Sequence, residues 1–157
     1  MKKLRIALFW ILSLTWGLPG TLAGALGAAV ELIKGSELRL YHGNVCIETS
    51  RAKGSLSLGP FIFLSKAYTP YTRFHEAGHG IQNIIYGPLY LIIVGLTSIT
   101  WYHIYNKIYR EKIAAGLLTV DEQRKNYEKW WVEKQATEFG RKIYYSIDQK
   151  EQGGGLI

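Results

Sequence analysis

The stretch His75-Glu76-Ala77-Gly78-His79 carries two histidines four residues apart, with a glutamate directly after the first. On an α-helix, residues four apart lie on one face, because 3.6 residues complete a turn. The two imidazoles could therefore bind one Zn²⁺, each with one nitrogen at about 2.0–2.1 Å. Glu76 would reach a water on the metal rather than the metal itself, which is the position of a general base. The alternative interpretation is a helix whose two histidines only cap or pack.

The residues around this stretch predict the bounds of its helix. Thr69 is a favourable N-cap, Pro70 suits the first helical position, and Gly87-Pro88 stops the helix. Gly78 and Gly80 each destabilise a helix by about 1 kcal/mol relative to alanine. Their presence beside the histidines predicts that another helix or a substrate approaches the backbone closely.

A second helix, predicted from Val120 to about Ser146, offers a third metal ligand. It begins at a capping box formed by Thr119 and Glu122. Five of its residues fall on one face at spacings of three and four: Trp130, Glu133, Thr137, Gly140 and Tyr144. A lone buried carboxylate is costly, and a metal would remove that cost, so Glu133 is the predicted ligand. The alternatives are Glu138 as the ligand, or an ion pair of Glu133 with a lysine or arginine.

Composition bounds the class of partner. The 157-residue chain is expected to form one domain, and its formal net charge is +7. A basic chain suits nucleic acid or anionic lipid. The lysines and arginines are scattered and no nucleic-acid motif is present, so membrane lipid is preferred and nucleic acid is not expected. Cys46 is the only cysteine, which excludes an intramolecular disulfide and a cysteine-rich zinc site. It is expected to be a small packed residue.

Residues 1–33 are predicted to form a membrane anchor, a single membrane-embedded helix. The run of 25 residues from Ile6 to Val30 contains no charge, and as a helix it exceeds a hydrocarbon core of ~30 Å. Gly20, Gly24 and Ala28 form a strip of small residues that permits close helix contact. Two alternatives are a cleaved signal segment and an apolar hairpin, bent at Pro19, that lies in one leaflet.

Residues 34–66 are predicted to contain two or three short strands, within Val45–Thr49 and Ser55–Leu64. The strands would form a small hairpin or sheet beside the HEAGH helix. An edge strand there could bind an extended peptide through backbone hydrogen bonds, or the strands could simply cover the helix. His42, which precedes Gly43-Asn44, is expected to be a turn residue rather than a ligand.

The apolar segment 89–102 is short for a membrane span. It is predicted to be an embedded or re-entrant segment, or else a core helix. His103 follows it among aromatic residues, a context that favours an interfacial or packed residue over a third ligand. Residues 151–157 are predicted to be a disordered tail.

The motifs resemble those of a known class of enzymes. HEAGH followed by Glu133-Lys134-Gln135-Ala136 is similar to the HExxH and downstream ExxA pattern of gluzincin-type zincin metallopeptidases. The chain from about residue 57 to residue 145 also resembles a group of small bacterial membrane-associated proteins, through HEAGHGIQ, GPLYLIIVGLTS and a Trp-rich ExxA helix. The resemblance implies zinc bound by His75, His79 and Glu133, with Glu76 as the general base.

Two positions depart from these patterns. Ala77 stands where the bacterial group often has an aromatic residue. Thr137 stands where a gluzincin carries an acidic residue that orients a histidine, which weakens the support of the ligands. The implied fold is α+β and zincin-like, mainly α with a small β sheet, and residues 34–150 would form one domain.

The expected function is that of a membrane-associated zinc metallopeptidase, in the bacterial cytoplasmic membrane, that hydrolyses peptide or protein substrates near the bilayer. Tyr144, Tyr145 and His103 are candidates for stabilising the oxyanion of the reaction. The competing hypothesis is a non-catalytic membrane interaction module with a structural or vestigial metal site. An open water position on the metal would favour the enzyme, and a fourth protein ligand would favour the structural role.

Overall fold

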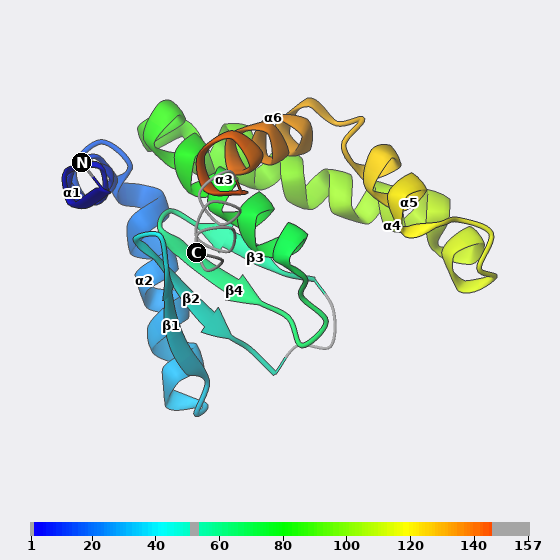
Figure 1. Cartoon of the computed structure of the whole chain (residues 1–157), viewed down its shortest axis with the longest axis horizontal. Helices are drawn as coiled ribbons and strands as arrows, with labels where there is room; N and C mark the ends of the chain where they lie inside the picture. The colour runs from blue at the N-terminus through cyan, green and yellow to red at the C-terminus, as the bar shows by residue number, and fades with distance from the viewer. Residues whose placement is uncertain (1, 51–53, 146–157) are drawn as a thin grey trace, which may run out of the picture.

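A small β-sheet lies between two helices in the computed structural model of the chain (Figure 1), which describes residues 2–50 and 54–145. Helix α2 (Leu18–Ile33) covers one face of the sheet, and helix α3 (Pro70–Tyr86), which carries the HEAGH stretch, covers the other. Helices α4, α5 and α6 follow α3 in the chain. The architecture is mainly helical with one small sheet, which confirms the predicted α+β class.

The first 33 residues form two helices rather than the single embedded helix predicted from the sequence. Helix α1 (Lys2–Leu14) meets α2 at an angle of 96°. Pro19 lies in the first turn of α2. The N–H groups of a first turn have no hydrogen-bond partner within the helix, so a proline there costs no bond and begins the helix instead of kinking it. Among the described residues, no helix taken alone is long and apolar enough to cross a membrane, although α1 with α2, and α3 with the helical segment that follows it, form bent pairs that pass this test together.

The predicted strip of small residues on α2 makes close contact, but with the sheet. Gly20, Gly24 and Ala28 are buried. A Cβ atom placed on Gly24 would lie 2.2 Å from the main-chain oxygen of Leu58, which is far closer than two such atoms approach. The small residues therefore let α2 lie directly against the sheet.

The sheet has four strands in the order β1-β2-β4-β3. Strands β1 and β2 are antiparallel, as are β3 and β4, while β2 and β4 run parallel. The strands are β1 (Glu37–Tyr41), β2 (Asn44–Glu48), β3 (Leu56–Leu58) and β4 (Phe61–Leu64). The two predicted stretches contain β2, β3 and β4, but β1 was missed because four of its five residues are exposed and two of these carry charge.

The turn between β1 and β2 consists of His42 and Gly43, with φ angles of 48° and 91°. Two successive residues with positive φ are typical of the tight type I′ hairpin turn. His42 is therefore the turn residue that the sequence predicted.

Alternate side chains of the strands build two cores, because successive residues of a strand face opposite sides of the sheet. On the α3 side, Cys46 and Ile62 pack with Phe74 and Ala77. On the α2 side, Ile47, Phe63 and Ala28 form the second core. Burial raises the pKa of the Cys46 thiol to about 12, so this residue is an unreactive packed side chain, as expected.

Helix α3 has the predicted bounds. The side chain of Thr69 accepts a hydrogen bond from the main-chain N–H of Thr72, and Pro70 opens the helix. Gly87 follows the last residue with a φ angle of 52°, a conformation that glycine adopts without strain.

The segment 89–102, predicted to be embedded, has one buried side and one exposed side. It comprises η1 (Gly87–Leu89), the π-helix η2 (Leu91–Leu96) and the start of α4 (Thr97–Ala114), and the segment bends away from α3 by 119°. Tyr90 and Val94 are buried against Val132 of α6. The opposite side of the segment is exposed.

The last long helix predicted from the sequence is divided in two, so the prediction of one continuous helix is wrong. Helix α5 (Val120–Tyr127) begins at the predicted capping box, and α6 (Trp131–Gly140) follows after a break and continues into the π-helix η3 (Arg141–Tyr145). At the break, Trp130 stacks on Trp101, whose indole N–H donates a hydrogen bond to the main-chain oxygen of Tyr127. These tertiary contacts satisfy the helix end, which a sequence pattern cannot show. The predicted tail 151–157 lies outside the described residues.

Helices α3 and α6 cross with their backbones almost in contact. A Cβ atom on Gly78 would lie 1.9 Å from the main-chain oxygen of Ala136, and one on Gly140 would lie 2.0 Å from that of Phe74. The close approach predicted at Gly78 is therefore that of a helix. At Gly80 the nearest groups belong instead to Asn44 and Gly59 of the sheet region.

We expect the substitution Gly78→Ala to destabilise the fold by about 2 kcal/mol or more, because its methyl group would force α6 away from α3. Gly95→Ala is the matched control, since the nearest atoms to its added methyl group would be 4.0 Å away. The control should leave stability unchanged or raise it by up to about 1 kcal/mol. Chemical unfolding of both variants measures the difference, and equal stabilities would contradict the close crossing.

Candidate metal centre

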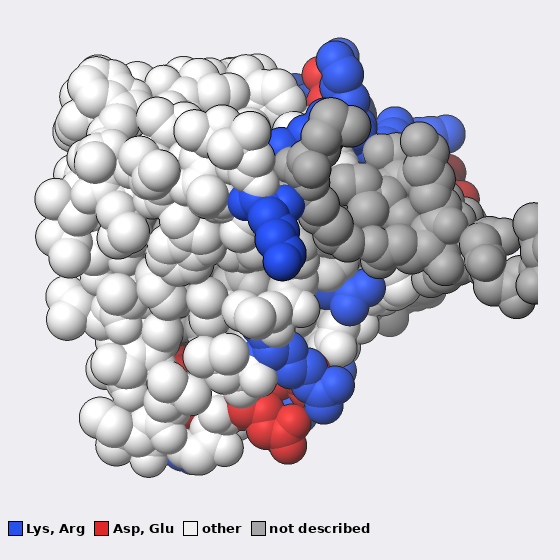
Figure 2. All heavy atoms as spheres, turned by 60° about the vertical axis from the view of Figure 1, so that its left-hand side comes forward, with Lys and Arg blue, Asp and Glu red and all other residues white. Residues whose placement is uncertain are grey.

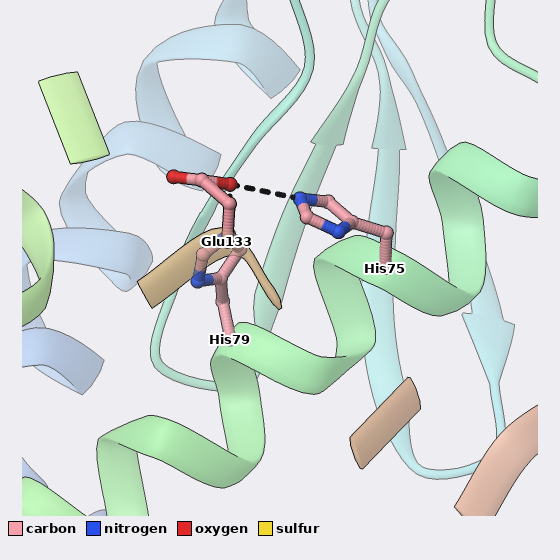
Figure 3. Close-up of side chains that lie close together, drawn as sticks. All are labelled: His75, His79 and Glu133. Atoms are coloured by element: carbon pink, nitrogen blue, oxygen red, sulfur yellow. Dashed lines mark ion pairs between the residues drawn. The ribbon is translucent and has the colours of Figure 1, made fainter. Parts of the chain in front are cut away.

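His75 and His79 of α3 and Glu133 of α6 converge on one point (Figure 3). The Oε2 atom of Glu133 lies 3.2 Å from Nε2 of His75 and 3.5 Å from Nε2 of His79. One potential ligand atom from each residue lies within 4.8 Å of the others, and all three side chains are buried. In the part of the chain that the structure describes, this is the group of histidine, cysteine and acidic residues that could hold a metal ion.

The distances from Glu133 to the two imidazoles are compatible with a tetrahedral ion. Two ligands at about 2.0–2.1 Å from zinc and at a tetrahedral angle lie about 3.3 Å apart, close to the two distances observed. Both carboxylate oxygens of Glu133 are buried and neither has a hydrogen-bond partner among the described residues. A buried carboxylate without hydrogen bonds is costly, and a cation between it and the two imidazoles would remove that cost.

Gln82 orients His79. The amide nitrogen of Gln82 donates to the main-chain oxygen of Val132 and to Oε1 of Gln135, both at 2.9 Å. Its own oxygen, 2.6 Å from Nδ1 of His79, must then accept the imidazole proton. This leaves the Nε2 lone pair of His79 directed at Glu133, as a metal ligand requires.

A chain of hydroxyl groups orients His75. Its Nδ1 lies 2.9 Å from Oγ1 of Thr137, which is 3.3 Å from the hydroxyl of Tyr71. The Tyr71 hydroxyl donates to the carboxylate of Glu128. Protons can therefore be donated in one direction, from His75 through two hydroxyls to a carboxylate. Thr137 itself carries no charge, but through Tyr71 it connects His75 to the carboxylate of Glu128. The sequence alone did not reveal this connection.

The electrostatics favour positive charge between Glu133 and the two imidazoles. Burial disfavours a charge on His79, but the contact with Glu133 and the charges of Glu133 and Glu76 outweigh this and raise the pKa of His79 to about 9. Burial likewise disfavours the Glu133 carboxylate, yet the two imidazoles hold its pKa well below the ordinary value. A proton shared with the imidazoles balances Glu133 in the metal-free site, and a metal ion can take the place of that proton.

Glu76 is buried but stands outside the group of three ligands. The hydroxyl of Ser57, on strand β3, lies 2.7 Å from its Oε2 atom and 2.8 Å from its main-chain oxygen. The hydroxyl of Tyr90 donates to the main-chain oxygen of Ser57 at 3.0 Å and so fixes the strand. Ser57 thus holds one carboxylate oxygen of Glu76 in place.

A cavity of about 620 Å³ opens beside these residues. Strand β3 borders it on one side, and η2 with the first part of α4 borders it on the other. His75, Glu76, His79 and Glu133 line it, together with several tyrosines that include Tyr127. The site is therefore accessible to a molecule larger than water.

The other candidate residues lie elsewhere. Glu138 is exposed and lies 4.0 Å from Lys134, so Glu133 rather than Glu138 belongs to the site. His103 lines the cavity but is exposed and outside the ligand group. Tyr144 is buried in the core and stacks on His42, which removes it as a stabiliser of an oxyanion. The side chain of Tyr145 is not among those described.

Tyr127 is a residue of the cavity that sequence reasoning missed. Its ring lies against that of His75, with centroids 6.5 Å apart. Burial, followed by the charges of Glu133 and Glu76, raises its pKa well above the ordinary range, so its hydroxyl remains a proton donor. Its position six residues before Glu133 gave no signal, because the break between α5 and α6 removes the usual relation between spacing and helix face.

For the metal-free protein, we expect stability to fall as the pH rises from about 6.5 through about 9. The pKa of His79 is raised from 6.5 to about 9 in the folded state, so its proton stabilises the fold fully below pH 6.5 and this contribution is lost as the pH passes 9. The expected slope is about 1 kcal/mol per pH unit. Thermal unfolding across this range, after treatment with a chelator, measures it.

Two controls accompany the measurement. Zinc-saturated protein should lack the fall, because the metal then balances Glu133 in place of the proton. The His79→Ala variant should lack it too, whereas His103→Ala should retain it. The same fall in wild type and His79→Ala would exclude His79 as its source.

We expect Thr137→Val to weaken zinc binding by about 10- to 100-fold, because valine has the same shape but cannot accept the Nδ1 proton of His75. Thr100→Val is the matched control, since the hydroxyl of Thr100 is exposed and bonds only to its own helix. Competition with a chromophoric chelator gives the two affinities. Wild-type affinity in Thr137→Val would remove the hydroxyl chain from the site.

Comparisons with known proteins gave no match: no family model, no curated protein and no solved structure matches the chain. The resemblance to gluzincin metallopeptidases therefore stays a prediction from the motifs. What the residues themselves establish is a buried group, His75, His79 and Glu133, that could hold a metal ion.

Proposed function

We propose that the protein is a zinc-dependent peptidase associated with a membrane. The observation that carries this proposal is the Glu133 carboxylate, which comes from a separate helix, meets both HEAGH imidazoles and has no hydrogen-bond partner among the described residues. A glutamate suited to act as a base, Glu76, lines the same cavity. The two features together favour catalysis over a purely structural site.

The chemistry of the ligand set favours zinc. Two imidazole nitrogens and one carboxylate are the ligands of catalytic zinc in several hydrolases, whereas structural zinc sites use four protein ligands. Zinc bound by these residues would act as a Lewis acid. It would polarise a peptide carbonyl and lower the pKa of a water molecule toward neutral pH. His75, His79 and Glu133 all line the cavity, so an ion that they held would be next to a bound substrate.

Glu76 is proposed as the general base. Its carboxylate would take a proton from the attacking water and pass it to the amine that leaves. Ser57 holds the Oε2 atom, which leaves the Oε1 atom for the water. Ser57 is in this proposal a positioning residue, because it acts through Glu76.

Tyr127 is proposed to stabilise the negative charge that develops on the carbonyl oxygen. Its raised pKa keeps the hydroxyl protonated, so it can donate a hydrogen bond to an oxyanion. The ring contact with His75, and the position of Tyr127 in the lining of the cavity, support this role.

The cavity favours an extended peptide as the substrate. Strand β3 is at the edge of the sheet and borders the cavity, so a peptide could add to it through backbone hydrogen bonds. The Tyr90 hydroxyl already donates a hydrogen bond to the main-chain oxygen of Ser57. The peptide would therefore pair with the part of the chain nearer Gly54 and Ser55. The tyrosines and aliphatic residues of the opposite wall suit an apolar substrate side chain.

We expect Glu133→Ala to lose zinc and Glu76→Gln to keep zinc while losing activity by about 10²-fold or more. The first variant lacks a ligand, and the second has the ligands but no base. Metal content of the purified proteins, and hydrolysis of a fluorogenic peptide library, measure the two effects.

Glu138→Gln is the matched control, because Glu138 lies on the same helix but is exposed. It should behave as wild type in both assays. Zinc retained by Glu133→Ala would remove Glu133 from the metal centre, and full activity of Glu76→Gln would remove the proposed base.

A further inference from the structure

Helix α2 has its large apolar side chains on the outside. Five of them are exposed at spacings of three and four, on one face of the helix: Leu18, Leu22, Leu26, Val30 and Ile33. The opposite, buried face carries small residues, Gly20, Gly24 and Ala28. A helix of a protein surrounded by water has the reverse arrangement, with large apolar residues inside and polar residues outside. The pattern of α2 suits an apolar environment.

Two neighbouring segments continue this surface. Helix α1 contacts α2, where the Thr21 hydroxyl donates to the main-chain oxygen of Ser13 at 2.8 Å, and Trp16 lies against Gly87 at the start of η1. Both segments expose large apolar side chains: Leu4, Leu8 and Ile11 on α1, and Leu89, Ile92, Leu96 and Ile99 on η1, η2 and α4. We call these residues, with the five of α2, the apolar face.

Charged residues are absent from the apolar face and gather at its border. Figure 2 shows an expanse almost without Lys, Arg, Asp or Glu, with basic side chains and some acidic ones along its edge. The only charged residue of α2, Glu31, is buried beside Lys34 and Ser36. In the sequence, exposed Lys3 and Arg5 flank Leu4 at the start of the face, and exposed basic residues follow the face at positions 107 and 110, with exposed Glu111 beside the second.

The extent of the face, twelve exposed apolar side chains, and its chemistry indicate what covers it. Proteins that stay monomeric in water rarely expose an apolar patch of more than a few hundred Å². An interface with another protein would carry about ten hydrogen bonds and a polar rim of both signs. The apolar face consists of side chains that cannot form hydrogen bonds. Among its exposed flanking charges, Lys3, Arg5, Lys107 and Arg110 outnumber Glu37 and Glu111. An apolar face with an excess of basic charge at its border is the combination that an anionic lipid surface binds.

We propose that the apolar face docks on the surface of an anionic membrane. The exposed leucine, isoleucine and valine side chains enter the hydrocarbon of one leaflet, and Lys3, Arg5 and the basic residues of α4 contact the lipid phosphates. Three connected helical segments form the docking surface, and the sheet with α3 and α6 remains on the water side.

Docking would also place the cavity at the membrane. Ile99 belongs to the apolar face and lines the cavity, so the wall between lipid and cavity is a single helical segment. For the peptidase proposed above, this position favours peptide segments next to the bilayer as substrates. The docking itself does not depend on the metal centre, and the experiment below separates the two.

Flotation with lipid vesicles tests the proposal. Full-length protein should float with vesicles of phosphatidylcholine that contain phosphatidylglycerol. The variant Leu22→Asp/Leu26→Asp should bind at least about tenfold more weakly, because aspartate is strongly disfavoured in hydrocarbon. Replacing Lys3 or Arg5 with glutamine should weaken binding by about fivefold each at low salt, and less at high salt.

Matched variants separate lipid docking from a general effect of added charge and from the state of the metal centre. Leu117→Asp is the first control, because Leu117 is as exposed as Leu26, 71% in both cases, but lies in the turn between α4 and α5. It should bind as wild type, and so should Glu133→Ala, which removes a proposed metal ligand and leaves the apolar face intact. Circular dichroism confirms that each variant is folded.

Two results would overturn the proposal. The first is unchanged vesicle binding in Leu22→Asp/Leu26→Asp. The second is failure of wild type to float, together with a dimer in sedimentation that the aspartate pair dissociates, which would assign the face to a second copy of the chain. Loss of floating in Glu133→Ala alone would contradict the independence of docking and metal centre.

Discussion

The close crossing of α3 and α6 is the contact on which the site depends. Glycine at positions 78 and 140 lets each helix place a main-chain oxygen where a side chain would otherwise lie. A glycine in a helix lowers its stability by about 1 kcal/mol relative to alanine. The two glycines at the crossing allow the helices to pack more closely than any larger residue would permit. The consequence is geometric, since only at this separation does a side chain as short as Glu133 reach both imidazoles of α3.

The same crossing creates an electrostatic requirement. Glu133 is fully buried and its oxygens have no hydrogen-bond partner among the described residues. Positive charge is therefore favoured beside it, either as a proton on the histidines or as a metal ion that the group could hold. Gln82 and Thr137 hold the protons of the two imidazoles on the far side of each ring, which keeps both Nε2 atoms directed at that point. A site with this arrangement is ready for a metal before one arrives, and little has to move on binding.

The apolar surface and the candidate site share structural elements. Segment η2 with the start of α4 presents Ile92, Leu96 and Ile99 outward and lines the cavity inward. Helix α2 supports the sheet from behind with its small residues and exposes its large ones. A fold of this size has few elements, so each element that forms the site also has a face on the outside of the molecule. On α2, η2 and the start of α4, these outer faces are apolar.

The sequence by itself determined the local features of this protein: the bounds of α3, the turn at His42, the capping box at Thr119, the α+β class and the choice of His75, His79 and Glu133. These follow from spacing and from residue types whose preferences act over a few residues. The tertiary structure decided the rest. The bend between α1 and α2, the break between α5 and α6 at Trp130, and the roles of Ser57, Gln82, Tyr127 and Glu128 depend on contacts between residues far apart in the chain, which periodicity in one segment does not encode.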